Sequence, residues 1–94
     1  VPHNPLSPVS TAACLQIAAH APNFSLQEYP IGENVPPKSD MVIGIAKHDG
    51  NGYLTISDAP GLGIELNPDA IELCPPVPRE VATRLHADGS VIDQ

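Results

Sequence analysis

The segment from Pro8 to His20 places the strongest constraint on what this chain can fold into. Ser7 and Pro8 form a helix-start signal, with Ser at the N-cap and Pro in the first turn. Pro22 ends the helix because it disfavours helical geometry at the residue before it. The predicted helix is apolar on nearly all sides, which is typical of a helix buried on more than one side. Nothing else in the 94 residues looks large enough to cover it, so we expect the chain to need a larger body.

The rest of the chain is rich in turn-forming residues, with 12 prolines and 7 glycines. Apolar and polar residues alternate from Phe24 to Tyr29, which predicts a short strand. Two further apolar runs flank a turn-forming loop at residues 48–52, and this arrangement predicts a hairpin over about residues 42–57. A short helix is expected from Asp69 to Leu73, capped by Asn67. We find no helix–strand alternation long enough to close a sheet.

The charge balance disfavours two classes of partner. The formal net charge is −7, and the four basic residues, Lys38, Lys47, Arg79 and Arg84, do not cluster. Binding to a phosphate backbone needs a basic face, and an anionic membrane surface is disfavoured for the same reason. The most apolar run, residues 9–21, is too short to cross a bilayer. We therefore expect no nucleic-acid partner and no membrane partner.

The cysteines and the start of the chain bear on its compartment. Cys14 and Cys74 allow one disulfide at most, and two reduced thiols are expected. The chain opens without Met, and its first residues show neither the basic start nor the apolar core of a signal peptide. We therefore expect a cytoplasmic protein, and a fragment or processed piece of a longer one.

Residues 47–58 can be aligned with the calcium-binding loop of an EF-hand, but the alignment is poor. Lys47 stands where the first carboxylate ligand belongs, and Asp58 replaces the usual bidentate glutamate. The flanking residues are rich in Gly and Pro rather than helical. The turn chemistry predicts a plain hairpin loop instead. A small acidic interaction fragment without enzymatic activity is a separate alternative, which the length of the chain leaves open.

Three stretches, in this order along the chain, carry a resemblance to a known family. They are Pro2-His3-Asn4-Pro5-Leu6-Ser7-Pro8-Val9 leading into Thr11–Leu15, then Pro22–Tyr29, then Asp58–Leu66. Together they resemble the last third of the sugar-acid dehydratases of the mandelate racemase/muconate lactonizing enzyme family, in the enolase superfamily. Galactonate-type dehydratases are the most similar. The loop from Ile31 to Asp40 matches no part of this pattern.

This resemblance implies an α/β fold in which the chain is the C-terminal fragment of a (β/α)8-type barrel. Residues 1–29 would form the end of the barrel, with a catalytic loop, the seventh helix and the eighth strand. Residues 30–94 would form a C-terminal extension, which contains the hairpin at about 42–57 and a loop-rich tail. This extension would return to the capping domain and pack on barrel and cap. Functional groups of such barrels lie at the C-terminal ends of strands, which suits His3 and Glu28.

The resemblance also implies a hydro-lyase reaction on an aldonic acid. The enzyme would abstract the proton α to the carboxylate and expel the 3-hydroxyl, which yields a 2-keto-3-deoxy acid. His3 matches the general base of the family. Glu28 matches the acid that, in its protonated form, donates a hydrogen bond to the developing enolate oxygen.

The remaining catalytic groups are expected outside this chain. The family uses Mg²⁺ to stabilise the enolate, and its three acidic ligands match nothing here. A second histidine, which would protonate the leaving hydroxyl, is also missing. We therefore expect the 94-residue chain alone to be inactive. The complete enzyme would join it to the remainder of the barrel and the capping domain, act on a sugar acid and form a homo-oligomer. The resemblance implies galactonate as the substrate, with gluconate and mannonate as alternatives.

Overall fold

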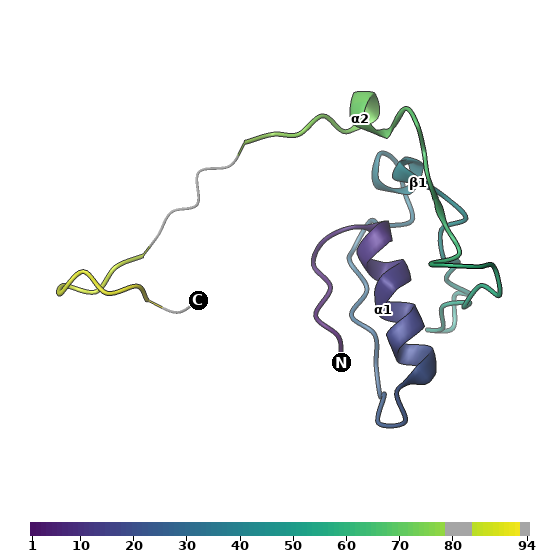
Figure 1. The fold of residues 1–94 in the computed structure, drawn as a ribbon, viewed down its shortest axis with the longest axis horizontal. Helices are drawn as coiled ribbons and strands as arrows, with labels where there is room; N and C mark the ends of the chain where they lie inside the picture. Colours follow the sequence, from purple (N-terminus) through teal and green to yellow (C-terminus); the bar gives the residue numbers. More distant parts are fainter. Residues whose placement is uncertain (79–83, 93–94) are drawn as a thin grey trace.

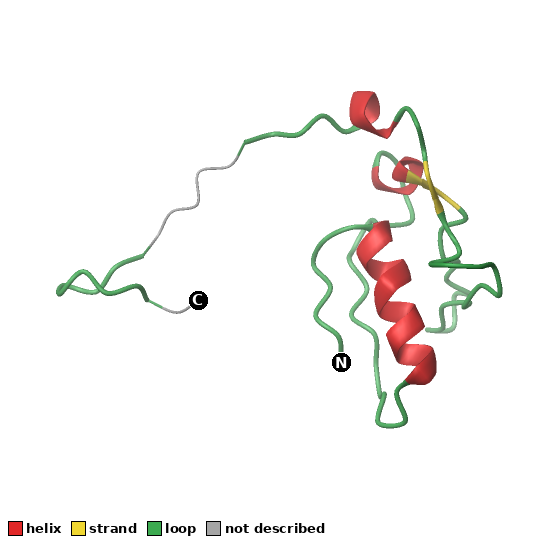
Figure 2. Cartoon of the chain, in the orientation of Figure 1, coloured by secondary structure: helices red, strands yellow, loops and turns green. Residues whose placement is uncertain are grey.

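In the computed structural model, one long helix is surrounded by loops and short elements, and residues 1–78 and 84–92 are described (Figure 1). The elements in chain order are helix α1 (Pro8–His20), the 3₁₀ helix η1 (Lys38–Met41), strand β1 (Val42–Ile43), strand β2 (Glu65–Leu66) and helix α2 (Ala70–Leu73). Loops make up most of the chain between these elements (Figure 2). Among the described residues, α1 is the only element longer than four residues.

The predicted helix is confirmed at both ends, because α1 spans Pro8–His20. Pro8 stands in the first turn, where its missing N–H leaves no internal hydrogen bond unmade. Ser7 occupies the N-cap position with extended backbone, although its side chain makes no capping hydrogen bond. Its carbonyl instead accepts a hydrogen bond from the N–H of Thr11 at 3.0 Å.

Only one face of α1 is covered by this chain. Its buried residues are Pro8, Thr11, Ala12 and Leu15, whereas Ile17 is 61% exposed. Among the described residues, the buried hydrophobic side chains are Ala12, Leu15 and Val42. The exposed Ile17 shows that α1 presents apolar surface that the described residues do not cover.

The segment that follows α1 differs from its prediction as a strand. Residues 24–29 run back along α1 without helical structure (Figure 1), and they pair with no strand among the described residues. A lone extended segment has no neighbour with which to form the ladder of hydrogen bonds that defines a strand. Its role as the eighth strand of a barrel stays a prediction, because neighbouring strands would have to come from outside the chain.

The hairpin is shorter than predicted. His48 bridges Leu54, and the N–H of Thr55 donates to the carbonyl of Lys47 at 3.1 Å. The predicted pairing does not extend to residues 42–57, because β1 pairs with β2 in antiparallel register. Turn residues specify a local loop, whereas the partner of a strand depends on how distant segments pack.

Asp49 is used inside this turn. Its carboxylate accepts hydrogen bonds from the backbone N–H groups of Asn51 at 2.7 Å and Tyr53 at 3.1 Å. These backbone hydrogen bonds, that from Tyr53 first, lower the pKa of Asp49. An Asp that satisfies the backbone of its own loop is the usual chemistry of such turns, which supports a plain loop rather than a calcium site.

The predicted short helix is present, but it starts one residue later than expected and Asn67 is not its cap. Helix α2 spans Ala70–Leu73, with Asp69 at the N-cap and no side-chain capping hydrogen bond. The side-chain oxygen of Asn67 accepts a hydrogen bond from the N–H of Asp69 at 3.1 Å, which forms a turn before the helix. The side-chain nitrogen of Asn67 donates to the carbonyl of Asp40 at 2.6 Å and so connects this turn to η1.

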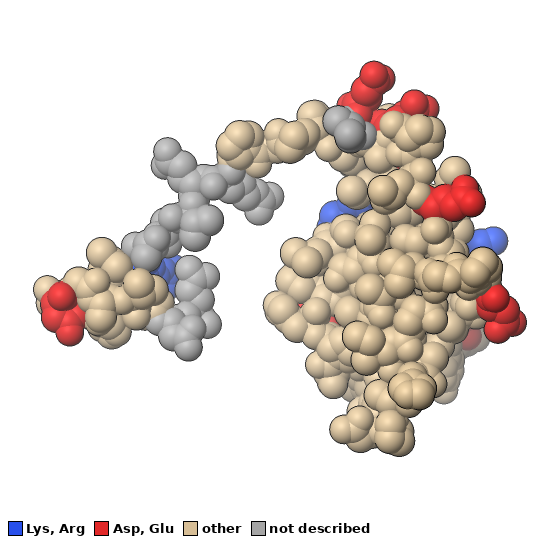
Figure 3. Space-filling view, viewed as in Figure 1, with Lys and Arg blue, Asp and Glu red and all other residues tan. Residues whose placement is uncertain are grey.

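Much of the surface is uncharged. In Figure 3 the main body shows a broad face without charged side chains, and several Asp and Glu side chains lie at its edge. Large hydrophobic side chains are among the exposed residues, including Leu26, Ile31, Ile43, Tyr53 and Leu66. Within the described ranges, no helix has the length and apolar character needed to cross a membrane.

Candidate active site

The fold brings the two predicted site residues into contact. The first residues of the chain and the segment after α1 lie side by side (Figure 1) and carry His3 and Glu28, respectively. His3 Nδ1 lies 3.2 Å from Glu28 Oε2. The side chains are 83% and 42% exposed, respectively. The pair is therefore accessible to a molecule in solution.

Asn4 connects the first residues of the chain to the segment after α1 through hydrogen bonds to Glu28. Its backbone N–H donates a short hydrogen bond to Glu28 Oε2. Its side-chain nitrogen donates to the carbonyl oxygen of Glu28 at 3.2 Å. The carboxylate that faces His3 is thus held from the same chain segment that carries His3.

A buried chain of hydrogen bonds continues from Asn4 into the protein. The Asn4 amide nitrogen also donates to Thr11 Oγ1 at 2.6 Å, and the Thr11 hydroxyl donates to Glu33 Oε2 at 2.7 Å. All three side chains are fully or almost fully buried. Burial raises the pKa of Glu33, although the hydrogen bond from Thr11 and the charge of Lys38 act in the opposite direction. We refer to Asn4, Thr11 and Glu33 as the buried relay.

The sequence analysis did not identify the buried relay. Asn4 and Thr11 lie within stretches that carry the family resemblance, but they read there as ordinary loop and helix residues. Glu33 lies in the loop of residues 31–40, which matched no part of the pattern. A glutamate in a loop is ordinarily exposed, so no sequence signal marked this one as buried.

The His3–Glu28 pair can act as a proton carrier. An imidazole can accept a proton, and a carboxyl group can take part in hydrogen bonds to a neighbouring oxygen. Such a combination suits removal of a proton from carbon together with stabilisation of the oxygen that becomes negative.

The described residues do not fit a metal site of their own. Across residues 1–78 and 84–92, no three His, Cys, Asp or Glu side chains lie close enough together to hold an ion. Cys14 and Cys74 are free thiols.

A second contact joins the hairpin loop to the segment that carries Glu28. The rings of Tyr29 and His48 stack with centroids 6.2 Å apart. His48 Nδ1 accepts a hydrogen bond from the N–H of Gly50 at 2.9 Å, which fixes the ring in its loop. Burial, followed by the charge of Glu33, raises the pKa of Tyr29. The stacking contact holds the hairpin loop against Tyr29, the residue that follows Glu28.

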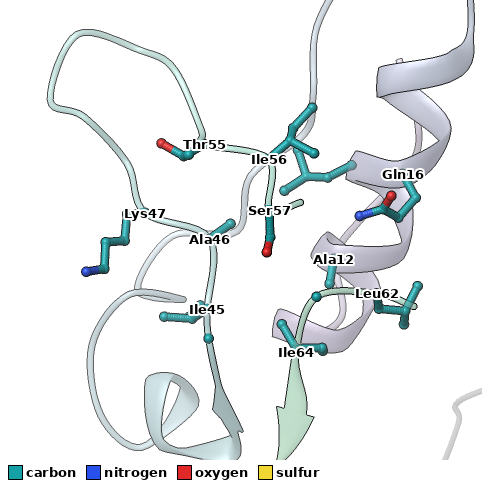
Figure 4. Close-up of a pocket in the computed structure, with 13 residues that line it drawn as sticks. Ala12, Gln16, Ile45, Ala46, Lys47, Thr55, Ile56, Ser57, Leu62 and Ile64 are labelled. Carbon is teal, nitrogen blue, oxygen red and sulfur yellow. The ribbon is translucent and has the colours of Figure 1, made fainter. Parts of the chain in front are cut away.

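A separate cleft of about 300 Å³ lies between α1 and the segments on either side of the hairpin loop (Figure 4). Residues of α1 line it together with residues 44–47, 55–57 and 62–64, and neither His3 nor Glu28 belongs to its lining. Gly63 has φ +71°, and a Cβ there would lie 2.8 Å from the Cβ of Ser57. Only glycine fits this backbone without a shift of its neighbours.

The sequence of this chain was compared with those of known protein families. Residues 1–70 match the family described as "Enolase C-terminal domain-like". The chain belongs to this family. The resemblance to the enolase superfamily stated from the sequence is thereby confirmed, and the α/β barrel class of the enolase C-terminal domain fits the chain. The arrangement of this chain within a barrel belongs to the proposal below.

Two curated relatives of this enolase-type chain share a name. A D-galactonate dehydratase of Xanthomonas campestris pv. campestris (strain B100) is 34% identical over 99 residues, which cover 98% of this chain and 26% of the relative. A D-galactonate dehydratase of Variovorax paradoxus (strain S110) is 35% identical with the same coverage. The chain thus spans about a quarter of the length of these relatives. No solved structure matches it.

Proposed function

We propose that this chain is the C-terminal, proton-transferring part of a sugar-acid dehydratase. The observation that carries the proposal is the accessible contact between His3 Nδ1 and Glu28 Oε2, at 3.2 Å. Similarity to proteins named D-galactonate dehydratase over nearly the whole chain supports it. The family resemblance suggests the role of each side chain, and the contact supports their acting together.

His3 is the general base in this proposal. Its neutral imidazole removes the proton from the carbon next to the substrate carboxylate, and the electron pair of the broken C–H bond moves onto a carboxylate oxygen. Glu28, as the carboxylic acid, donates a hydrogen bond to that oxygen. The exposure of both side chains supports these roles, since a substrate carboxylate can reach them from solvent.

The second half of the reaction returns the electron pair and expels the 3-hydroxyl. The C3–O bond breaks, the hydroxyl leaves as water after it gains a proton, and the resulting enol tautomerises to the 2-keto-3-deoxy acid. The acid that supplies this proton belongs, in our proposal, to the part of the enzyme outside this chain. Mg²⁺ and its three acidic ligands belong there as well.

The same proposal assigns residues 1–29 to the end of a barrel and residues 30–94 to an extension that packs on barrel and cap. Residues 79–83 and 93–94 of this extension lie outside the described residues. The uncovered face of α1 and the exposed Leu26 support such packing. An extended segment without a strand partner, residues 24–29, would gain one there. Homo-oligomer formation by the complete enzyme is part of the proposal.

Galactonate is the proposed substrate because the relatives quoted above are named for it. Gluconate and mannonate are the alternatives. The test is to assay the complete enzyme with Mg²⁺ and each aldonic acid, and to measure formation of the 2-keto-3-deoxy product. We expect turnover of one of the three and none by the His3→Asn variant. Absence of turnover with all three acids would favour a non-enzymatic acidic fragment instead.

A further inference from the structure

The buried relay ends at the main-chain carbonyl of Glu28, whose carboxylate faces His3, although none of the three relay side chains belongs to the predicted pair. Thr11 lies on α1 and Glu33 lies in the loop before η1, so each is supplied by a different part of the fold. The relay buries a carboxyl, a hydroxyl and an amide together. Burying such groups is unfavourable unless their hydrogen bonds are made in one defined arrangement.

With Glu33 ionised, the donors and acceptors of the relay run in one direction. The carboxylate then only accepts hydrogen bonds, so the single hydroxyl proton of Thr11 points to it. Thr11 Oγ1 can then only accept from Asn4, which turns the Asn4 nitrogen toward Thr11. The second hydrogen of that nitrogen reaches the carbonyl of Glu28.

A reversed Asn4 amide would break this arrangement. Its oxygen would face Thr11 Oγ1, whose proton is already donated to Glu33, and it would also face the carbonyl oxygen of Glu28. Two oxygens without a proton between them repel each other. Glu33, acting through Thr11, and the carbonyl of Glu28 therefore favour the same orientation of the Asn4 amide.

We infer that Asn4 is a positioning residue for the His3–Glu28 pair and that Thr11 and Glu33 fix its orientation through the buried relay. This inference rests on the proposed function for its kinetic consequences, but its geometry stands alone. Asn4 holds Glu28 at two points, through its backbone N–H and its side-chain nitrogen. Since His3 is the adjacent residue, the same two contacts fix the 3.2 Å approach of His3 Nδ1 to Glu28 Oε2.

The test uses hydroxyl variants at Thr11 in the complete enzyme. Thr11→Val keeps the volume of the side chain and removes the relay proton, whereas Thr11→Ser keeps the hydroxyl. Ser10→Ala is the matched control, because it removes a hydroxyl from the neighbouring position of α1 outside the relay. We expect Thr11→Val to lower kcat about 10- to 100-fold, with KM changed by less than about threefold, as for a displaced catalytic group. Thr11→Ser and Ser10→Ala should remain near the original rate.

A double variant separates the relay from general destabilisation. Glu33→Gln lets the amide nitrogen of Gln donate to Thr11, so the relay can reverse and kcat should fall. Once Thr11→Val has cut the relay, adding Glu33→Gln should lower kcat no further, because residues of one network are not additive. Losses that multiply in the double variant, or equal losses in the Val and Ser variants, would overturn the inference.

Crystal structures of the Thr11→Val and Ser10→Ala variants provide a readout independent of turnover. In Thr11→Val we expect the Asn4 amide to leave the carbonyl of Glu28 and the His3–Glu28 distance to lengthen, while Ser10→Ala keeps both. If the unmodified enzyme dehydrates no aldonic acid, the proposed function fails, and these distances still decide the positioning role. If turnover is normal and Thr11→Val changes neither distance nor kcat, the positioning role is wrong and the proposed function stands.

Discussion

Replacement of Glu28 by Gln and by Ala distinguishes a hydrogen-bond donor in the reaction from a merely structural carboxylate. Glu28 Oε2 faces His3 at 3.2 Å and accepts the backbone N–H of Asn4. Gln keeps an oxygen that can accept from Asn4 and a nitrogen that can donate to the enolate oxygen. Ala keeps neither, so the two variants differ in the functions that the structure assigns to this side chain.

The expected size of each effect follows from these contacts. Loss of one donor to a developing oxyanion lowers kcat by about 10²- to 10³-fold, or roughly 3–4 kcal/mol. Glu28→Ala should show this full loss, with substrate binding changed far less. It also leaves the Asn4 N–H without its acceptor in a partly buried position, which costs about 1–3 kcal/mol of folding stability. Glu28→Gln should lose less of both.

The assay is steady-state turnover of the preferred aldonic acid by the complete enzyme, together with the melting temperature of each variant. The reasoning predicts that kcat falls much further for Ala than for Gln, and that only Ala lowers the melting temperature clearly. If both variants lose equal and small amounts of kcat while their stability falls, Glu28 is a structural residue at the edge of the site. The role as donor to the enolate oxygen would then be wrong.

Four further predictions follow from the same structure. His3→Asn should abolish exchange of the substrate α-proton with solvent in the complete enzyme, because Asn cannot take up a proton at neutral pH, and Mg²⁺ affinity by calorimetry should be nearly unchanged; exchange at the original rate would move the base elsewhere. The 94-residue chain alone should form no 2-keto-3-deoxy acid and give no tight Mg²⁺ binding by calorimetry, since the described residues lack a ligand cluster. The same chain should self-associate or melt without cooperativity, because its exposed apolar surface promotes association, and a dilute monomer with a sharp melt would contradict this. Burial raises the pKa of Glu33, so the folded protein holds this proton more tightly than the unfolded chain does. The resulting contribution to stability is fully present below the ordinary pKa of 4.5 and is lost as pH rises through the raised pKa. Glu33→Gln should flatten this part of the profile of melting temperature against pH, measured between about pH 4 and 8.

Several features of this protein could be predicted from sequence because their signals are local. Pro8 and Pro22 bound the helix, since proline fits a first turn and excludes helical geometry before it. Asp49 and Asn67 satisfy backbone groups a few residues away, so the hairpin turn and the turn before α2 needed no distant partner. His3 and Glu28 were identified by the motifs around them, which say nothing of the distance between the two side chains.

The tertiary structure decided every feature that depends on distant segments. Strand β1 pairs with β2 rather than with the apolar run after the hairpin loop, and residues 24–29 find no strand partner among the described residues. His3 meets Glu28 only because the segment after α1 turns back along the first residues of the chain. Glu33 is buried only because its loop passes over Thr11. Backbone chemistry fixes turns and helix ends over a few residues, whereas burial and long-range contact are set by packing, which no short stretch of sequence encodes.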